Sequence, residues 1–473
     1  MINLKDIISA LTDQELPQLD IAISSVEIDS RQVQPGSLFI ALPGEWVNGH
    51  DYVGSAFSQG AILALIDKDL PGELPTLDLR QSFFDFNADQ VTIPMCLRVD
   101  HSLIALQTIA KYWRDQHPIQ TIGITGSVGK TSTKELTAAL LAEKFSVLKN
   151  PGNRNNEIGL PLTLLELEPH HACAVLEMGF YVPGEIRTLC EIAQPHVGVI
   201  TNIGTVHAER AGSQEIIAKG KAELIEALPP GPDGVAILNM DDTWIQGMLD
   251  QTSAHVFSYG IKENADLMAK TVQSHGLSGI SCVLSYQGQD HPIRSPLLGA
   301  FSVYTILCAS AVALKLGLEW DLITSTLAVS QLDLRMHAFT LNNGTTILDD
   351  TYNASPASMI AALDLLSGLS GRRVAVLGDM LELGPYEKSG HETVGLAAVT
   401  AADVLILVGP RAKTIAEVAV ANGFPSESVY WYLDSIQAAA YISEIVCYGD
   451  TVLIKGSNSM HMDRILNVLA EGK

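Results

Sequence analysis

The amino-acid sequence predicts an α/β protein of three domains, in which mostly parallel sheets are wrapped by helices. Its 473 residues are more than one compact core can use, so two or three domains are expected. Apolar, strand-like runs alternate with helical patterns between Thr121 and Asn239, and a second series of this kind begins at Thr345. Because such alternation is typical of parallel sheets, we expect domains at residues 1–117, 118–332 and 333–473.

The first domain has a turn-rich region in place of the alternating pattern. Three turn-forming pairs surround an apolar strand at 37–42, namely Pro35-Gly36, Pro43-Gly44 and Asn48-Gly49. A helical pattern follows at 102–115, and Gln116-His117-Pro118 forms a linker into the second domain.

The second domain begins with an apolar run, a glycine turn and a helix, TIGITGSVGKTSTK at 121–134. Glycines let successive backbone N–H groups point into one concavity, and the helix adds the positive end of its dipole. Lys130 can then reach the terminal phosphates of a nucleotide, and the Thr131 hydroxyl can coordinate Mg²⁺. Ile124 stands where the usual P-loop has its first glycine, and a simple connecting turn is the alternative. The combined features favour an ATP-binding loop formed by Gly126, Ser127, Val128, Gly129, Lys130, Thr131 and Ser132.

Two later segments complete the fold prediction. Residues 265–294 have the pattern of a polar β excursion, and the uncharged stretch at 295–314 indicates a buried helix rather than a membrane span. The series from Thr345 has strands at 374–377, 404–408, 429–433 and 451–455 but no glycine-lysine loop. The prediction is therefore a central parallel-sheet domain with a P-loop, followed by a Rossmann-like, doubly wound domain.

In the second domain, polar side chains follow the ends of predicted strands, where parallel sheets bind their ligands. Glu177 could hold Mg²⁺ or cap a helix, and we favour the metal-related role. His207 by itself would be a structural histidine, and composition alone makes Lys221 a surface lysine. The segment NPGNRNNEIGLP at 150–161, which contains Asn155 and Asn156, either only turns the chain or forms a surface for a polar, anionic substrate.

In the third domain, the segment LDDTYNASPASM at 348–359 places Asp350 at a strand end, and Ser355-Pro356 begins a helix. GDMLELG at 378–384 and KGSNSM at 455–460 follow two more strands. Because this domain would face the ATP-binding domain, the concentration of polar residues predicts a cleft between the two domains.

The composition excludes several classes of protein. A net charge of −24 argues against general binding to nucleic acid or to anionic membranes. The six cysteines form no CxxC pair, and the N-terminus has acids within its apolar periodicity and no signal-like core. We expect a cytoplasmic monomer that neither binds nucleic acid nor inserts into a membrane.

Taken together, these motifs resemble the Mur ligase family over essentially the whole chain. The first domain is similar through DSR…PGSLFIAL…NGHDY, the second through TGSVGKTSTKE, VLEMG, VITNIGTVHAE and KAEL, and the third through DDTYNASPASM, AVLGDMLELG and LIKGS. The resemblance implies an ATP-dependent amide ligase of peptidoglycan precursor synthesis. NNEIGLP and DDTYNASP favour the member that adds D-Ala-D-Ala to the UDP-N-acetylmuramoyl tripeptide through an acyl phosphate.

The resemblance also implies roles for individual residues. Lys130, His207 and Lys221 would be catalytic, with Lys221 carbamylated, and Mg²⁺ would be held by Thr131, Glu177 and His207. Arg335 and Asp350 would contact the nucleotide in addition to the P-loop. The UDP-linked substrate would bind to Ser30, Arg31, Asn48, Gly49, His50, Asn155 and Asn156.

The sequence departs from the family pattern near the adenine. Phe301, Ser302 and Thr305 stand where the family has a His-Asn…Asn pattern, so the adenine contacts stay open. Ser355 and Asn458 replace a more usual asparagine and arginine.

The sequence leaves three alternative functions to consider. A sibling ligase adding a diamino acid or glutamate is the nearest alternative. A regulatory GTPase needs an NKxD motif, which the sequence lacks, and a non-catalytic nucleotide-dependent binding module is the third possibility. Neither the third residue of the tripeptide, lysine or diaminopimelate, nor the residues that bind D-Ala-D-Ala are specified.

Overall fold

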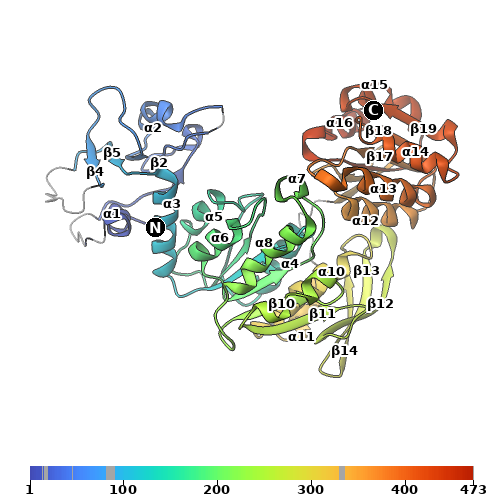
Figure 1. The fold of residues 1–473 in the computed structure, drawn as a ribbon, viewed down its shortest axis with the longest axis horizontal. Helices are drawn as coiled ribbons and strands as arrows, with labels where there is room; N and C mark the ends of the chain where they lie inside the picture. The colour runs from blue at the N-terminus through green and yellow to red at the C-terminus, as the bar shows by residue number, and fades with distance from the viewer. Residues whose placement is uncertain (13, 15–19, 45, 81–90, 330–335, 472–473) are drawn as a thin grey trace. The chain divides into compact units, whose positions relative to one another are not determined.

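The computed structural model describes residues 1–471 apart from 13, 15–19, 45, 81–90 and 330–335 (Figure 1). Three sheets with their own helices confirm the predicted three-domain α/β architecture. The chain divides into two compact units. The first contains Met1–Gly123, Phe145–Gly179 and Glu185–His196, and the second contains Ile124–Lys144, Phe180–Gly184 and Val197–Lys473. The boundary at 117/118 stays a prediction, and the boundary at 332/333 lies outside the described residues.

A five-stranded, parallel sheet forms the N-terminal part of the first unit. Its order is β1 (Val26–Glu27), β2 (Leu38–Ile40), β3 (Leu63–Ile66), β5 (Met95–Arg98) and β4 (Thr76–Asp78). The helices here are α1 (Leu4–Thr12), η1 (Ser30–Gln32), η2 (Gly49–Tyr52), α2 (Val53–Ser58) and α3 (Ser102–Asp115). Phe39, Ala64 and Cys96 of neighbouring strands pack against Val53 and Ala56 of α2. The strand and helix expected at 37–42 and 102–115 are therefore present.

The second sheet has nine strands in the order β14-β13-β12-β11-β10-β9-β6-β8-β7. The first unit holds β7 (Val147–Lys149), β8 (Cys173–Glu177) and the start of β6 (Gln120–Thr125). The second unit holds the end of β6 together with β9 (Val197–Ile200), β10 (Val235–Asn239), β11 (His255–Gly260), β12 (Leu267–Ser274), β13 (Ile280–Tyr286) and β14 (Gln289–Ser295). The pairs from β9 to β12 are parallel, whereas β12, β13 and β14 form antiparallel hairpins. These hairpins are the predicted β excursion.

Among the described residues, helices of 4 to 14 residues accompany this sheet, with two short 3-10 turns. In the first unit they are α5 (Gly159–Leu164) and α6 (Glu185–Ala193). In the second unit they are α4 (Lys130–Ala142), α7 (Ala208–Ala211), α8 (Gln214–Glu226), α9 (Thr243–Gln246), η4 (Leu249–Gln251), η5 (Gly276–Ser278), α10 (Ser302–Lys315) and α11 (Trp320–Val329). The uncharged stretch forms α10, whose residues from Ile306 to Ala313 are all buried, as expected. Among the described helices, none has both the length and the apolar character of a membrane span.

The C-terminal sheet is doubly wound. Its order is β15 (His337–Thr340), β16 (Thr346–Asp350), β20 (Thr451–Lys455), β17 (Arg373–Gly378), β18 (Val404–Val408) and β19 (Val429–Tyr432), and only β15 pairs antiparallel. Its helices are α12 (Pro356–Ser367), η6 (Gly384–Tyr386), α13 (Glu387–Ala401), α14 (Lys413–Ala421), η7 (Ser426–Ser428), α15 (Ser435–Ile445), η8 (Asn458–Met460) and α16 (Asp463–Glu471).

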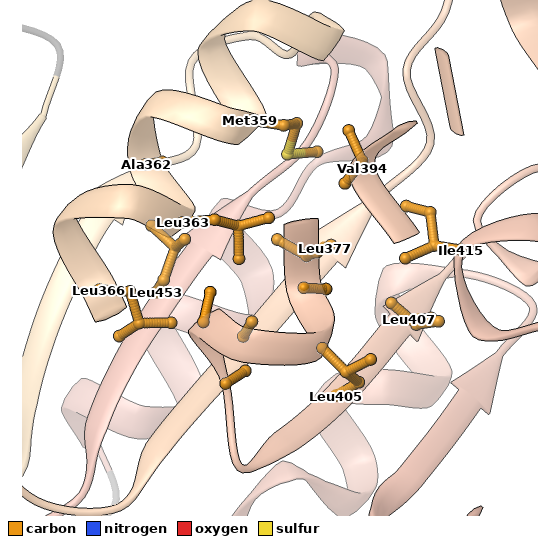
Figure 2. Packing of buried hydrophobic residues seen from close by; sticks show 14 of the residues in the cluster. Met359, Ala362, Leu363, Leu366, Leu377, Val394, Leu405, Leu407, Ile415 and Leu453 are labelled. Carbon is orange, nitrogen blue, oxygen red and sulfur yellow. The ribbon is translucent and has the colours of Figure 1, made fainter. Parts of the chain in front are cut away.

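Alternate strand residues build a separate core on each face of this sheet, since side chains along a strand point to opposite faces. Leu377, Leu405 and Leu453 belong to the core that contains residues of α12, α13 and α14, as Figure 2 shows. Val376 and Ile406 belong to the other core, with residues of α15 and α16. The predicted Rossmann-like arrangement is confirmed.

Candidate active site

The glycine turn between β6 and α4 is held in a conformation that glycine alone tolerates well. Gly126 has φ +149° and Gly129 has φ +85°. A Cβ on Gly126 would overlap the Thr201 hydroxyl, which itself donates to the Val128 carbonyl at 2.7 Å. Asn202 also binds Val128 through its side-chain amide. Its Nδ2 donates to Val128 O at 2.8 Å, and its Oδ1 accepts from Val128 N at 3.0 Å. The residues after β9 thus hold the glycine turn in one conformation.

Two lysines converge on one carbonyl of this loop. Lys130 Nζ donates to Gly126 O at 2.9 Å, and Lys221 Nζ of α8 donates to the same oxygen at 3.1 Å. Lys221 is 2% exposed, and its ammonium lies 4.9 Å from the centre of the Phe180 ring. The expectation from composition that Lys221 lies on the surface is therefore wrong. Its burial concentrates positive charge where a triphosphate would bind.

His207 lies after β9 and precedes α7, with its backbone in the left-handed region (φ 66°). Its Nδ1 lies 2.5 Å from Glu382 Oε2, and its ring meets the edge of Tyr181 at 4.6 Å between centroids. Burial, helped by the charge of Lys130, lowers the pKa of His207 to about 4, although Glu382 acts in the opposite direction. The imidazole is thus neutral at neutral pH, and Nε2 can act as a metal ligand.

Glu177 ends β8 in the first unit and is fully buried. Its Oε1 accepts from Asn155 Nδ2 at 2.8 Å, and Asn150 exchanges two hydrogen bonds with its backbone, at 2.9 and 3.0 Å. Asn156 Oδ1 accepts from Gly159 N at 2.9 Å, at the start of α5. Asn150 and Asn155 therefore support the end of β8, whereas Asn156 accepts a hydrogen bond at the start of α5, and the role of Asn155 and Asn156 toward substrate stays a prediction.

The expected magnesium ligands divide between the two units, with Thr131 and His207 in the second and Glu177 in the first. Within the described ranges, no group of three or more His, Cys, Asp or Glu side chains is gathered for a metal. Mg²⁺ in nucleotide sites commonly needs only one or two carboxylates besides phosphates and water. The hydroxyl and carboxylate oxygens of Thr131 and Glu177 are suitable ligands for it.

A cavity of about 370 Å³ adjoins the P-loop through Val128 and Gly129. Its walls include the aromatic rings of Trp244, Phe301 and Tyr304, together with Thr305. The Tyr304 hydroxyl donates to Asp241 Oδ2 at 2.8 Å. That carboxylate also accepts the backbone N–H groups of residues 261–263, which fixes the tyrosine. The cavity is a suitable place for the adenine base of a nucleotide. It is lined by Phe301 and Thr305, two of the three residues at which the sequence departs from the family pattern.

A second cavity, of about 190 Å³, has the P-loop residues 127–132 on its wall together with C-terminal polar residues. The latter include Asp350, Asn353, Ser355 and Lys455, and Ser302 also lines it. Lys455 is buried and donates to Asp350 Oδ2 at 2.5 Å and to Asn353 O at 2.8 Å. This cavity corresponds to the cleft that was predicted from the polar residues at the strand ends of the C-terminal domain. Arg335, the other expected nucleotide contact, lies outside the described residues.

The expected residues for the UDP end lie after the neighbouring parallel strands β1 and β2 of the first unit. Asp29 caps η1 and pairs with Arg31 at 2.6 Å, and the Arg31 side chain is 86% exposed. Ser30, also in η1, is buried. The Arg31 guanidinium is thus exposed to solvent while Asp29 holds it in place through its Nε and Nη2 groups.

The 48–50 segment of the same unit is folded around a buried histidine. Asn48 caps η2, and its oxygen lies 2.8 Å from His50 Nδ1. His50 Nε2 accepts from Asp67 N at 3.1 Å, and burial lowers the pKa of His50. A Cβ on Gly49 would lie 2.7 Å from Leu42 N, so the turn is close-packed. Substrate binding by Ser30, Arg31 and these residues stays a prediction.

Sequence reasoning missed two charged residues of the second unit. Glu382 contacts His207, and Lys455 contacts Asp350. Glu382 lies in the GDMLELG segment and Lys455 in the KGSNSM segment. Sequence analysis identified both segments as polar strand ends but did not indicate which side chain in each makes the contact.

Three family models match: the "Mur ligase family, catalytic domain" over residues 22–73, the "Mur ligase middle domain" over 124–313 and the "Mur ligase, glutamate ligase domain" over 334–458. The UDP-N-acetylmuramoyl-tripeptide–D-alanyl-D-alanine ligase of Synechocystis sp. is 37% identical, covering 95% of this chain and 92% of the relative. The enzyme of the same name from Escherichia coli is 32% identical, covering 98% of each chain.

Solved structures agree with the sequence relatives. A crystal structure of MurF from Acinetobacter baumannii has a TM-score of 0.86 at 28% identity, covering 99% of this chain and 98% of that one. MurF ligase from Thermotoga maritima in complex with ADP has a TM-score of 0.80 at 27% identity, covering 94% and 97%. With similarity that extends over nearly the full length of its relatives, this chain belongs to the Mur ligase family.

Proposed function

We propose that this protein is the ATP-dependent ligase that joins D-Ala-D-Ala to a UDP-N-acetylmuramoyl tripeptide during peptidoglycan precursor synthesis. The observation that carries the proposal is the shared cavity lined by the P-loop and by Asp350, Asn353 and Lys455. A ligase needs such an arrangement because the nucleotide and the reacting groups must meet away from water. The names of the curated relatives support this choice of substrates.

The reaction follows from the chemistry of a carboxylate, which is a poor acyl donor until its oxygen becomes a good leaving group. ATP phosphorylates the terminal carboxylate of the tripeptide, which gives an acyl phosphate and ADP. The amine of D-Ala-D-Ala attacks the acyl carbon, loses a proton, and phosphate leaves as the amide bond forms. The protein contributes positioning and charge neutralisation through the loop N–H groups and Lys130, whose ammonium already lies at Gly126 O. Mg²⁺, held by Thr131, Glu177 and His207, would supply further neutralisation at the phosphates.

We further propose that Lys221 carries a carbamate. Two ammonium groups at one carbonyl oxygen, those of Lys130 and Lys221, repel each other. Reaction of the neutral Lys221 amine with CO₂ would replace one cation by an anion with two oxygens that suit a hard metal.

The carbamate is tested by replacing Lys221. Lys221→Ala should be nearly inactive and partly rescued by a short carboxylic acid, and removal of CO₂ should lower wild-type activity. Lys219→Ala, on the same helix but 70% exposed, serves as the control and should keep its activity. A fully active Lys221→Ala enzyme would rule out the carbamate as a catalytic requirement.

Mass spectrometry of the product tests the proposed reaction as a whole. The enzyme is given ATP and UDP-N-acetylmuramoyl tripeptide with either lysine or diaminopimelate at the third position. D-Ala-D-Ala, a diamino acid and glutamate are offered as separate acceptors. A product with D-Ala-D-Ala alone supports the proposal, and a product with another amine would make this chain a sibling ligase. Phosphate release that depends on both substrates would exclude a non-catalytic nucleotide-dependent binding module.

The proposed setting is the cytoplasm, where ATP and nucleotide-linked sugars are available, and the proposed state is a monomer without a nucleic-acid partner. The net charge of −24 supports the last point. Light scattering coupled to gel filtration measures the oligomeric state directly.

A further inference from the structure

Two loops that are distant in sequence meet beside the nucleotide site of the second unit. One follows β9 and includes His207, and the other follows β17 and includes Glu382. Besides the pair between His207 Nδ1 and Glu382 Oε2, Glu209 N donates to Glu382 O at 3.2 Å. Gln214 N donates to the Tyr386 hydroxyl at 3.3 Å. The contact therefore contains one bond between side chains and two that involve the backbone.

The loops approach each other too closely for an ordinary surface contact. A Cβ on Gly384 (φ 52°) would lie 2.8 Å from Glu209 Cα, so a larger residue would force the loops apart. The ring of Tyr181 closes another side of the His207 imidazole. The position of the ring is thus fixed by several elements at once.

Backbone strain is concentrated at this contact. Of the described residues, six that are not glycine have a positive φ, and His207 (φ 66°) and Glu382 (φ 62°) are two of them. Such conformations persist only where the surroundings enforce them, and they gather at functional sites. That two of the six face each other through a short hydrogen bond indicates that the geometry of this pair is maintained for a purpose.

The chemistry of the pair suggests that purpose. A carboxylate that accepts from Nδ1–H selects one tautomer of imidazole and leaves the Nε2 lone pair for another ligand. Metal-binding histidines commonly have such a carboxylate behind them. We propose that Glu382 is a positioning residue that orients His207 toward the nucleotide's metal ion. The ligand is then correctly set only while the loop after β17 is docked. This inference rests on the proposed role of His207 as a ligand of Mg²⁺.

The first test measures metal binding without catalysis. Mn²⁺, which favours the same oxygen-rich sites as Mg²⁺, is titrated into enzyme saturated with ADP and followed by electron paramagnetic resonance. Glu382→Ala should weaken Mn²⁺ binding 10- to 100-fold, the usual range for loss of such a supporting group. Tyr386→Phe is the matched control, because it removes another bond between the same loops and leaves the His207 pair intact. Its Mn²⁺ affinity should stay within about twofold of wild type.

The second test reads the histidine itself. Nitrogen NMR of histidine-labelled protein, with His207→Gln identifying the signal among 13 histidines, reports the tautomer. Wild-type His207 should carry its proton on Nδ1, whereas Glu382→Ala should shift the population toward the Nε2–H form. Glu382→Gln keeps the size of the side chain and replaces the alanine variant in both tests if that variant is unstable. It should also weaken Mn²⁺ binding and shift the His207 tautomer, but less than Glu382→Ala does. Wild-type Mn²⁺ affinity and tautomer in both variants would overturn the inference.

Mn²⁺ binding by His207→Ala distinguishes failure of the positioning role of Glu382 from failure of the proposed metal role of His207. If His207→Ala retains full Mn²⁺ affinity, the proposed metal role of His207 is wrong. If His207→Ala loses affinity while both Glu382 variants keep it, the metal role stands and only the positioning role of Glu382 fails.

Discussion

Replacing Lys455 by methionine should destabilise the C-terminal domain by about 3–5 kcal/mol. The ammonium of Lys455 donates to Asp350 and to Asn353 O, and both members of the ion pair are buried. Methionine retains most of the apolar stem but removes the positive charge from beside a buried carboxylate. Breaking such a pair on one side leaves a desolvated charge, which is far more costly than losing an exposed pair.

Hydrogen exchange of β17 and β18 peptides gives the assay, since these strands report on unfolding of the same domain. At 1.4 kcal/mol for each factor of ten, exchange through global unfolding should accelerate roughly 100- to 4,000-fold. Arg373→Met is the matched control in the same sheet. Arg373 pairs with Asp403 at 2.8 Å, but the two side chains are 22% and 42% exposed. Loss of this exposed ion pair should lower the free energy of unfolding by less than about 1 kcal/mol, which corresponds to an increase in exchange rate of less than about fivefold.

A double variant completes the experiment. Asp350→Leu combined with Lys455→Met removes both charges and should recover much of the stability lost in the single variant. Equal effects of Lys455→Met and Arg373→Met would refute the reasoning, because burial of the pair would then have no energetic consequence. Stability is measured in place of activity, since Asp350 is also an expected nucleotide contact.

Three further predictions concern the loop and the N-terminal domain. Gly126→Ala should raise the Kd for ATP at least about tenfold by calorimetry, because its Cβ would displace the Thr201 hydroxyl from Val128 O, and unchanged affinity would contradict this. Arg31→Ala should raise the KM for the UDP-linked substrate and leave the KM for ATP within about twofold; an equal rise in both would count against it. The pKa of His50 is lowered by burial, so below about pH 6.5 the unfolded chain binds the proton more readily and stability falls with falling pH. His50→Gln should flatten that fall in melting temperature between pH 7.5 and 5.5, and parallel curves would disprove the assignment.

The sequence was sufficient for elements whose signal is local. Strands buried on both faces, such as β8 and β18, appear as short apolar runs, and the P-loop is marked by glycines next to Lys130. The start of α12 was equally clear, because Ser355 and Pro356 carry the capping signal within a few residues. In each case the physical cause lies within one turn or one strand of the residue concerned.

The charged part of the site could not be predicted because its partners are chosen by packing between distant segments. Lys221 lies in a helix with charged neighbours, and its contacts with Phe180 and with the loop at Gly126 come from segments far away in the sequence. Glu382 is 175 residues from His207, and nothing near either residue indicates the other. The roles of Glu177, Asn155 and the other expected ligands stay predictions.

The place of β20 in its sheet affects how the protein is made. β20 lies between β16 and β17 and bonds to both, yet Asp350 at the end of β16 precedes Lys455 by 105 residues. At about 5–20 residues per second, a ribosome needs roughly 5–20 seconds to synthesise that interval. During this time β16, and β17 once it has been synthesised, are on the nascent chain without the strand that joins them. Their apolar edges are then open to other strands, so this domain should depend on chaperones that shield nascent chains until β20 has emerged.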